Sequence, residues 1–426
     1  MVRSSIHGLP RIGPRRELKL ALEAYWAGKG SAEELSDTAR SLRRANWSLL
    51  REAGIDLIPS NDFTLYDHVL DTAAMVGAVP SRHRQDPGPA GLDLYFAMAR
   101  GGNATAMEMT KWFDTNYHYI VPEFGPDSEF ALSDSKPLDH FLEARELGLV
   151  TKPVLLGPVS FLLLGKRGDG VSERFERLDL LEPLLDVYAE VLTRLGELGA
   201  GWVQLDEPCF VQDRTDPELA ALAGAYDRLA DLEGRPKLCV STYFDHAGEA
   251  LPVLAGMPLE GVGLDFASGP RNLALLRAAG GLPGKVLFAG VVDGRNIWVN
   301  DLDASLRLLE ELGGLCGELV VSTSSSLLHV PFDLDAETAL DAELRSWMAF
   351  ARQKVFEVAT LRRGLDQGSE AIAAELEVNR RTLVARRASP RTRNEAVRER
   401  VARLTAADAR RANPYEVRSA RQRELL

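Results

Sequence analysis

Two patterns of apolar residues alternate along most of the chain. Amphipathic segments long enough for helices, among them 178–198, 217–232, 272–280 and 302–312, separate short apolar runs typical of buried strands. Because parallel strands need long crossovers, this alternation predicts an α/β fold, a (β/α)8 TIM-type barrel over residues 55–361, with an open doubly wound sheet as the alternative. The eight predicted strands are 55–59, 118–122, 153–156, 202–205, 238–241, 262–266, 286–290 and 319–322.

The first 54 residues show helix signals instead. Pro14 suits the first position of a helix that continues to residue 26. Ser31 and Glu34 have the spacing of a capping box for a second helix, and Gly54 stands where a glycine commonly ends one. Residues 1–54 are therefore predicted to form a helical hairpin packed on the barrel.

The last segment, residues 362–426, differs in composition from the rest. It holds 16 arginines, no lysine and 9 acidic residues, a net charge of +7, whereas the whole chain carries −12. Pro390 and Pro414 interrupt its helical stretches, which predicts a basic helical linker. Because acids are interspersed and no aromatic-rich platform accompanies the arginines, the segment does not favour a nucleic-acid partner. No apolar run of 18 residues occurs, so we expect no membrane span and a cytoplasmic location.

Polar residues follow directly after many of the predicted strands. Because barrel enzymes carry their sites at the C-terminal rim, these residues mark the candidate site. The pair Asp206 and Glu207 could serve acid/base chemistry or a hard metal, but we expect it to organise the rim through Arg295 or backbone amides. An insertion at about 78–117 is predicted to be a lid or an ordered elaboration. The rim set is Asn61, Asp62, Glu123, Gly157, Asp206, Glu207, Thr242, Tyr243, Asp265, Asp293, Arg295 and 322–326.

Metal-binding patterns are absent from the sequence. Three cysteines lie far apart, and the histidines show no HxxxH or HxC spacing. A zinc site that combines His118, His246 and His329 with Cys239 or Asp265 is conceivable, but no spacing supports it. We therefore expect no metal site in this chain.

Longer motifs, taken in order, resemble the amino-terminal half of cobalamin-independent methionine synthases. The similarity covers nearly the whole chain, and so many long motifs in the family's order are highly specific. The motifs include LPRIG at 9–13, RRELK at 15–19, AYWAG at 24–28, EMTKWF at 108–113, TNYHY at 115–119, QLDEP at 204–208, SSLLH at 325–329 and ANPYEVR at 412–418.

This resemblance implies two barrels related by duplication, of which the second holds zinc, homocysteine and the reacting pterin. The chain would then lack catalytic residues and a metal of its own, with zinc in a C-terminal catalytic barrel as its partner. Ser325 stands where the duplicated half has a ligand cysteine. The residues matching those that reach the glutamate tail of 5-methyltetrahydrofolate polyglutamate are Arg16, Glu17, Leu18, Lys19 and Lys111.

The residues themselves fit such a tail site, although another interpretation is open. Arg15, Arg16 and Lys19 place positive charge at a helix start, where acids are usual, so an anion could compensate them. A solvated basic face is the alternative, and Lys111 could simply lie over the aromatic surface of Trp112. Two other functions stay open: a free-standing folate or polyanion-binding barrel, and a metal-dependent enzyme that uses Asp206, Glu207 and rim histidines.

Overall fold

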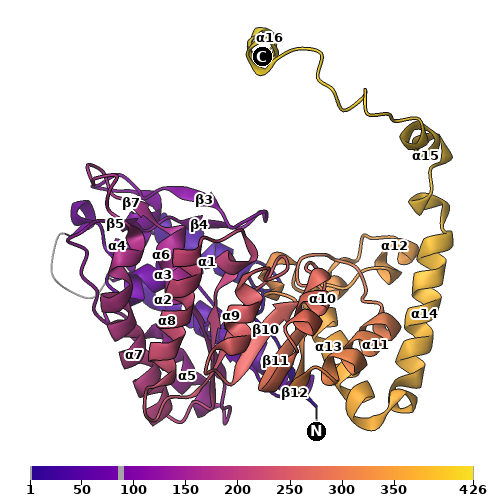
Figure 1. Ribbon diagram of the computed structural model, residues 1–426, viewed down its shortest axis with the longest axis horizontal. Helices are drawn as coiled ribbons and strands as arrows, with labels where there is room; N and C mark the ends of the chain where they lie inside the picture. Colours follow the sequence, from indigo (N-terminus) through magenta and orange to yellow (C-terminus); the bar gives the residue numbers. More distant parts are fainter. Residues whose placement is uncertain (1, 85–90, 426) are drawn as a thin grey trace. The chain divides into compact units, whose positions relative to one another are not determined.

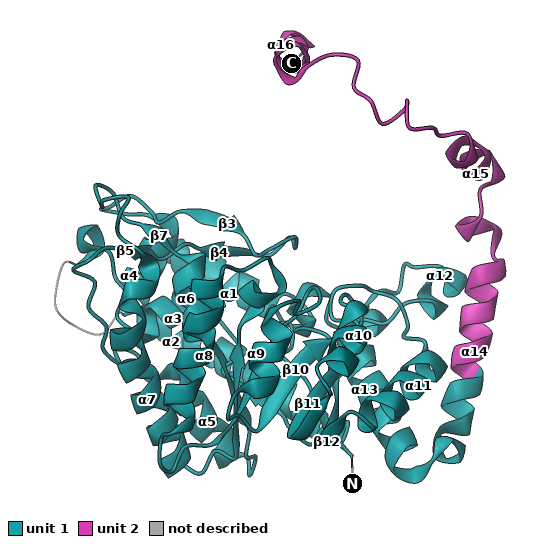
Figure 2. Ribbon diagram, in the orientation of Figure 1, with its two compact units in different colours: residues 1–377 teal, residues 378–426 magenta. Residues whose placement is uncertain are grey.

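The computed structural model of the chain describes residues 2–84 and 91–425 (Figure 1). Residues 85–90 of the predicted insertion at 78–117 lie outside the described residues. The chain divides into two compact units, Met1–Glu377 and Val378–Leu426 (Figure 2). The first unit holds all of the strands.

The first unit is built on a barrel of eight parallel strands in the order β1-β12-β11-β10-β9-β8-β6-β2. The Leu57 N–H, just before β2, donates to the Ser4 carbonyl of β1 at 2.9 Å and brings the two edges together. This confirms the TIM-type barrel and excludes the open doubly wound sheet. The strands are β1 (Arg3–Ser5), β2 (Pro59–Ser60), β6 (Lys152–Leu156), β8 (Trp202–Asp206), β9 (Lys237–Ser241), β10 (Gly261–Asp265), β11 (Leu282–Val292) and β12 (Cys316–Thr323).

Strand β1 corrects the sequence prediction in two ways. It supplies the eighth barrel strand in place of residues 118–122, and it turns the predicted hairpin into the first crossover of the barrel. The strand escapes pattern analysis because it is three residues long and polar. Its two serines are nevertheless fully buried, and the Ser4 N–H and hydroxyl both donate to the Asp56 carboxylate, at 2.8 and 2.9 Å.

Helices make the crossovers between the strands and follow the last strand, β12. They are α1 (Glu17–Trp26), α2 (Ala32–Glu52), α3 (His68–Met75), α4 (Leu92–Arg100), α5 (Lys136–Glu146), α6 (Pro158–Leu164), α7 (Leu181–Glu197), α8 (Asp216–Ala230), α9 (Ala250–Gly256), α10 (Arg271–Ala278), α11 (Leu302–Gly313), α12 (Ala342–Ser346) and α13 (Ala351–Gln367). Helix α14 (Ala373–Ala388) follows them.

The pair α1 and α2 forms as predicted, with one correction at its start. Ser31 and Glu34 make the reciprocal capping box of α2, and Gly54 adopts a φ of 78°, which a glycine tolerates. Helix α1, however, begins at Glu17 instead of at Pro14. The turn before it ends with Arg16 in the left-handed region, at φ 66° and ψ 30°.

Residues 118–122 lie in a small antiparallel hairpin instead of the barrel. Strand β3 (Met109–Lys111) pairs with β4 (His118–Ile120), so that Lys111 faces His118. A second small sheet joins β5 (Glu123–Phe124) to β7 (Lys166–Arg167). Glu123, which the sequence analysis assigned to the rim, begins β5 and forms an ion pair with Arg82 at 2.5 Å.

Two apolar clusters hold the hairpin and the barrel together. The main core lies between the strands and the crossover helices. A second cluster joins Leu18 and Leu22 of α1 to Met107, just before β3, and to Ile120 of β4. The N-terminal helix and the β3–β4 hairpin therefore share one buried apolar surface.

The second unit is helical and exposed. It carries the C-terminal part of α14, together with α15 (Glu395–Ala402) and α16 (Tyr415–Leu425). Neither α15 nor α16 has a buried residue. None of the described helices is long and apolar enough to cross a membrane.

Candidate functional site

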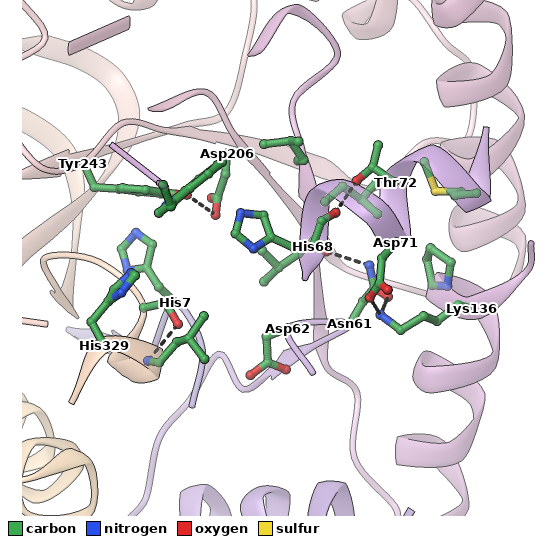
Figure 3. Close-up of a pocket in the computed structure, with 18 residues that line it drawn as sticks. His7, Asn61, Asp62, His68, Asp71, Thr72, Lys136, Asp206, Tyr243 and His329 are labelled. Carbon is green, nitrogen blue, oxygen red and sulfur yellow. Dashed lines mark hydrogen bonds and ion pairs between the residues drawn. The ribbon is translucent and has the colours of Figure 1, made fainter. Parts of the chain in front are cut away.

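A cavity of about 60 Å³ lies at the C-terminal rim of the barrel (Figure 3). Residues after β1, β2, β9 and β12, together with the last residue of β8, contribute to it, as the rim prediction required. Its apolar walls include Met75, Leu155 and Leu328. Its polar residues are His7, Asn61, Asp62, His68, Asp71, Thr72, Lys136, Asp206, Tyr243, Ser326 and His329.

The two carboxylates of the QLDEP motif do different things. Glu207 is fully buried and accepts hydrogen bonds from the Val159 and Ser160 N–H groups, at 3.2 and 2.7 Å, and from the Tyr226 hydroxyl at 2.8 Å. Burial raises the pKa of Glu207 to about 7. Its oxygens thus tie two barrel crossovers together, which confirms the expected bonding to backbone amides.

Asp206 lines the cavity instead. It accepts from the Tyr243 hydroxyl at 3.2 Å and from the Gln204 side-chain amide at 2.6 Å, and burial raises its pKa to about 6. The Gln204 carbonyl oxygen in turn accepts from the buried Lys152 ammonium. A polar chain therefore runs through the barrel interior and ends at the cavity.

Arg295 does not bind the Asp206–Glu207 pair, which corrects that part of the prediction. It forms an ion pair with Asp114 at the tip of the β3–β4 hairpin. Its guanidinium also lies 4.9 Å from the Phe244 ring centroid, and Phe113 of the tip packs on the same ring at 5.8 Å. These contacts hold the hairpin tip, residues 112–117, over the barrel mouth.

Trp112, the first residue of the hairpin tip, reaches the cavity itself. Its indole is buried, lines the cavity and meets the His68 ring edge-on at a centroid distance of 4.3 Å. On the other side of His68, the Tyr117 ring stacks at 5.6 Å. Burial lowers the pKa of His68 to about 3, so this imidazole is neutral at pH 7.

The predicted tail residues lie on two neighbouring elements. Arg16 is exposed at the N-cap of α1, and Lys19 lies one turn along, 3.5 Å from Glu23. Lys111 is exposed on β3. Helix α1 and the β3–β4 hairpin share the second apolar cluster through Leu18, Met107 and Ile120, but none of these cations lines the cavity.

Glu17 and Leu18 of the same motif form hydrogen bonds with the turn that precedes α1. The Glu17 carboxylate accepts the Arg15 N–H at 2.9 Å. The Leu18 side chain is fully buried, and its N–H donates to the Ile12 carbonyl at 3.2 Å. Both residues therefore fix the start of α1 and its preceding turn.

The described residues offer no set of zinc ligands. Within residues 2–84 and 91–425, no group of three or more His, Cys, Asp and Glu side chains could hold a metal ion. His118 is exposed on β4, whereas Cys239 is buried in a small cluster inside the barrel. Ser325 is fully buried, and its hydroxyl has no hydrogen-bond partner among the described residues.

Sequence analysis missed several residues of the cavity. His7 follows the polar strand that the pattern did not show, and Lys136 and Trp112 come from the insertion between β2 and β6. The EMTKWF motif around Trp112 was the available signal, because it marks more residues than the tail site needs.

These features define a class of protein: a TIM-type barrel domain with a roofed polar mouth and no metal cluster in its described part. A family profile described as "Cobalamin-independent synthase, N-terminal domain" matches residues 3–317. The chain is 55% identical, over all of its 426 residues, to 5-methyltetrahydropteroyltriglutamate–homocysteine methyltransferase of Streptomyces coelicolor, of which it covers 55%. It is 50% identical to homologue 2 of that enzyme in Arabidopsis thaliana, with 99% of this chain and 56% of that protein covered.

Solved structures agree on the fold. A B12-independent methionine synthase from Shewanella, in complex with selenomethionine, superposes with a TM-score of 0.56 at 17% identity, over 82% of this chain and 91% of that one. The chain belongs to the cobalamin-independent methionine synthase family and corresponds to its N-terminal domain. It spans about half the length of the curated relatives it matches.

Proposed function

We propose that this chain is the amino-terminal half of a zinc-dependent methyltransferase that moves the methyl group of 5-methyltetrahydrofolate polyglutamate to homocysteine. The observation that carries the proposal is the 55% identity, over the full chain, to proteins named for that reaction. Zinc bound in a C-terminal catalytic barrel would lower the pKa of the homocysteine thiol and so activate it. The chain's own part is to hold the glutamate tail.

The start of α1 offers the first half of a tail site. The positive end of the helix dipole lies there, and the exposed Arg16 and the half-buried Lys19 add two positive charges. The left-handed conformation of Arg16 turns the chain sharply into the helix, and the Glu17 carboxylate steadies the turn through the Arg15 N–H. Both features favour a preformed site for carboxylates.

Lys111 offers the second half. Strand β3 is exposed, and its partner β4 is anchored through Ile120 in the apolar cluster that also holds Leu18 and Leu22. A flexible chain of glutamates, each with a free carboxylate, can span two such cationic points. We infer that Arg16, Lys19 and Lys111 contact the tail, while Glu17 and Leu18 position the helix start.

This chain supplies no catalytic residue in the proposal. Glu207, the strongest candidate, already accepts three hydrogen bonds inside the barrel. The basic helical segment 362–426 leads toward the catalytic barrel. We therefore expect the chain, assayed alone with homocysteine and methylated folate, to form no methionine.

The proposal is tested by the dependence of folate affinity on tail length. The wild-type chain is titrated with monoglutamate and triglutamate forms of 5-methyltetrahydrofolate at low salt. Each exposed charge contact contributes up to about 1 kcal/mol, so two or three contacts should favour the triglutamate by up to about a hundredfold. The preference should shrink as salt is added, because exposed ion pairs are screened.

Three variants locate the effect. Arg16→Ala and Lys111→Ala should each reduce the preference for the triglutamate, and Lys29→Ala, an exposed cation of the α1–α2 loop, should leave it unchanged. Equal binding of both folates by the wild-type chain would refute the tail site. A preference that survives both site variants would place the tail elsewhere on the chain.

A further inference from the structure

The cavity at the barrel mouth is enclosed by parts of the fold that the tail site does not use. Trp112 of the hairpin tip lines it, and the Arg295–Asp114 ion pair fastens that tip to the loop after β11. Its volume, about 60 Å³, suits a molecule of a few non-hydrogen atoms better than a drug-sized ligand.

Negative charge dominates the polar lining of this cavity. Asp206 and Asp62 both contribute a carboxylate, and burial raises the pKa of each. Lys136, the cation in the lining, is already held by Asp71 at 2.6 Å and by the Asn61 side-chain oxygen at 3.0 Å. The buried Lys152 is near both carboxylates, but it does not line the cavity and donates to the Gln204 side chain. An anionic ligand would therefore meet two desolvated carboxylates and no unpaired cation in the lining.

Histidines add hydrogen-bonding capacity without adding charge. Burial lowers the pKa of His7 and His68 to about 3 and that of His329 to about 4, so all three rings are neutral at pH 7. His68 Nε2 is buried and has no hydrogen-bond partner among the described residues. Figure 3 shows the His68 ring reaching into the space between Asp206 and Asp62. A buried polar atom without a partner points to a missing ligand.

We propose that this cavity binds a small molecule that carries a primary ammonium group on a short apolar body. An ammonium has three N–H donors, and the cavity offers three acceptors: Asp206, Asp62 and the Nε2 lone pair of His68 in its Nδ1-protonated tautomer. Met75, Leu155 and Leu328 accommodate the apolar body. This site is independent of the glutamate-tail site, since the two share no residue.

The test uses n-propylammonium chloride as the probe, at pH 8 and at constant ionic strength. Its four non-hydrogen atoms match the cavity, and propan-1-ol and propionate serve as the neutral and anionic probes. Binding is followed through the indole 1H–15N signal of Trp112, which lines the cavity. We expect saturable binding of the ammonium below about 100 mM, and at least tenfold weaker binding of the other two probes.

Variants assign the binding to the cavity. Asp206→Asn and Asp62→Asn should each weaken n-propylammonium binding about tenfold or more, because a charge-assisted contact becomes a neutral one. Asp213→Asn, an exposed carboxylate on the loop after β8, should not change it. Far-UV circular dichroism verifies the fold of each variant, and either cavity variant alone decides the point.

Three results would overturn the proposal. One is equal affinity for n-propylammonium and propan-1-ol in the wild-type chain, which would leave only an apolar pocket. Another is unchanged binding in a folded Asp206→Asn or Asp62→Asn variant. The third is a Trp112 signal that stays unaffected by the ammonium across the whole titration.

Discussion

Replacing Glu207 with alanine should destabilise the barrel strongly. The change removes the acceptor of three buried donors: the Val159 and Ser160 N–H groups, at 3.2 and 2.7 Å, and the Tyr226 hydroxyl, at 2.8 Å. Each buried donor left without a partner costs about 1–3 kcal/mol. Because Tyr226 and entering water can partly relax, we expect a loss of about 3–5 kcal/mol in the free energy of unfolding.

Urea unfolding of Glu207→Ala and the wild type, followed by far-UV circular dichroism, measures this loss. Glu207→Gln is the matched control, because its amide keeps the volume and one acceptor oxygen; it should lose only about 1–3 kcal/mol. A loss below about 1 kcal/mol for Glu207→Ala would refute the structural role of this carboxylate. It would also reopen the possibility that the Asp206–Glu207 pair does chemistry.

The same carboxylate should make stability depend on pH. Burial raises the pKa of Glu207 from 4.5 to about 7 in the folded protein, so the folded state holds this proton more tightly than the unfolded state. The stability contributed by the proton is full below pH 4.5 and is lost as the pH rises through about 7. The shift corresponds to about 3 kcal/mol at most.

Comparison with Glu207→Gln isolates this effect, since glutamine does not titrate and other buried acids titrate in both proteins. The free energy of unfolding of the wild type, minus that of the variant, should fall between pH 4.5 and 7.5. A difference that stays constant over that range would contradict the account.

Three further outcomes are expected. Ser31→Ala should lower the free energy of unfolding by about 1 kcal/mol, because it removes the side-chain half of the capping box of α2; an unchanged urea midpoint would contradict this. A chelator should leave the melting temperature unaltered, since the described residues hold no metal cluster, and a drop on chelation would show that they do. Arg295→Gln should speed amide hydrogen exchange in residues 112–117, whose tip the Asp114 ion pair fastens, and equal protection would argue against that role.

Apolar periodicity predicted most of the barrel because its strands are buried on both faces and its crossovers are amphipathic. It failed at β1, where Arg3, Ser4 and Ser5 form a barrel strand without an apolar run. The burial of these serines depends on Asp56, 52 residues away, and on the neighbouring strand β12. The prediction of a barrel strand at residues 118–122 was wrong for a different reason. A strand-like pattern does not distinguish a barrel strand from a strand of a covering hairpin.

The rim residues were predictable as a group, but their individual roles were not. A strand-end position places Asp206 and Glu207 at the barrel mouth, but adjacent residues on a strand point to opposite sides. Glu207 therefore enters the crossover layer, whereas Asp206 faces the cavity. Arg295 pairs with Asp114 because the hairpin tip reaches the same rim. No local sequence pattern encodes the position of that tip.

The central claim is that the start of α1 and strand β3 together form one site for the glutamate tail. The most direct measurement is a titration of the isotope-labelled chain with γ-linked triglutamate, following the backbone signals of residues 16–19 and of Lys111. We predict that both sets of signals shift and saturate with the same dissociation constant, and that added salt weakens both alike. Shifts confined to one of the two elements, or two different dissociation constants, would contradict the claim.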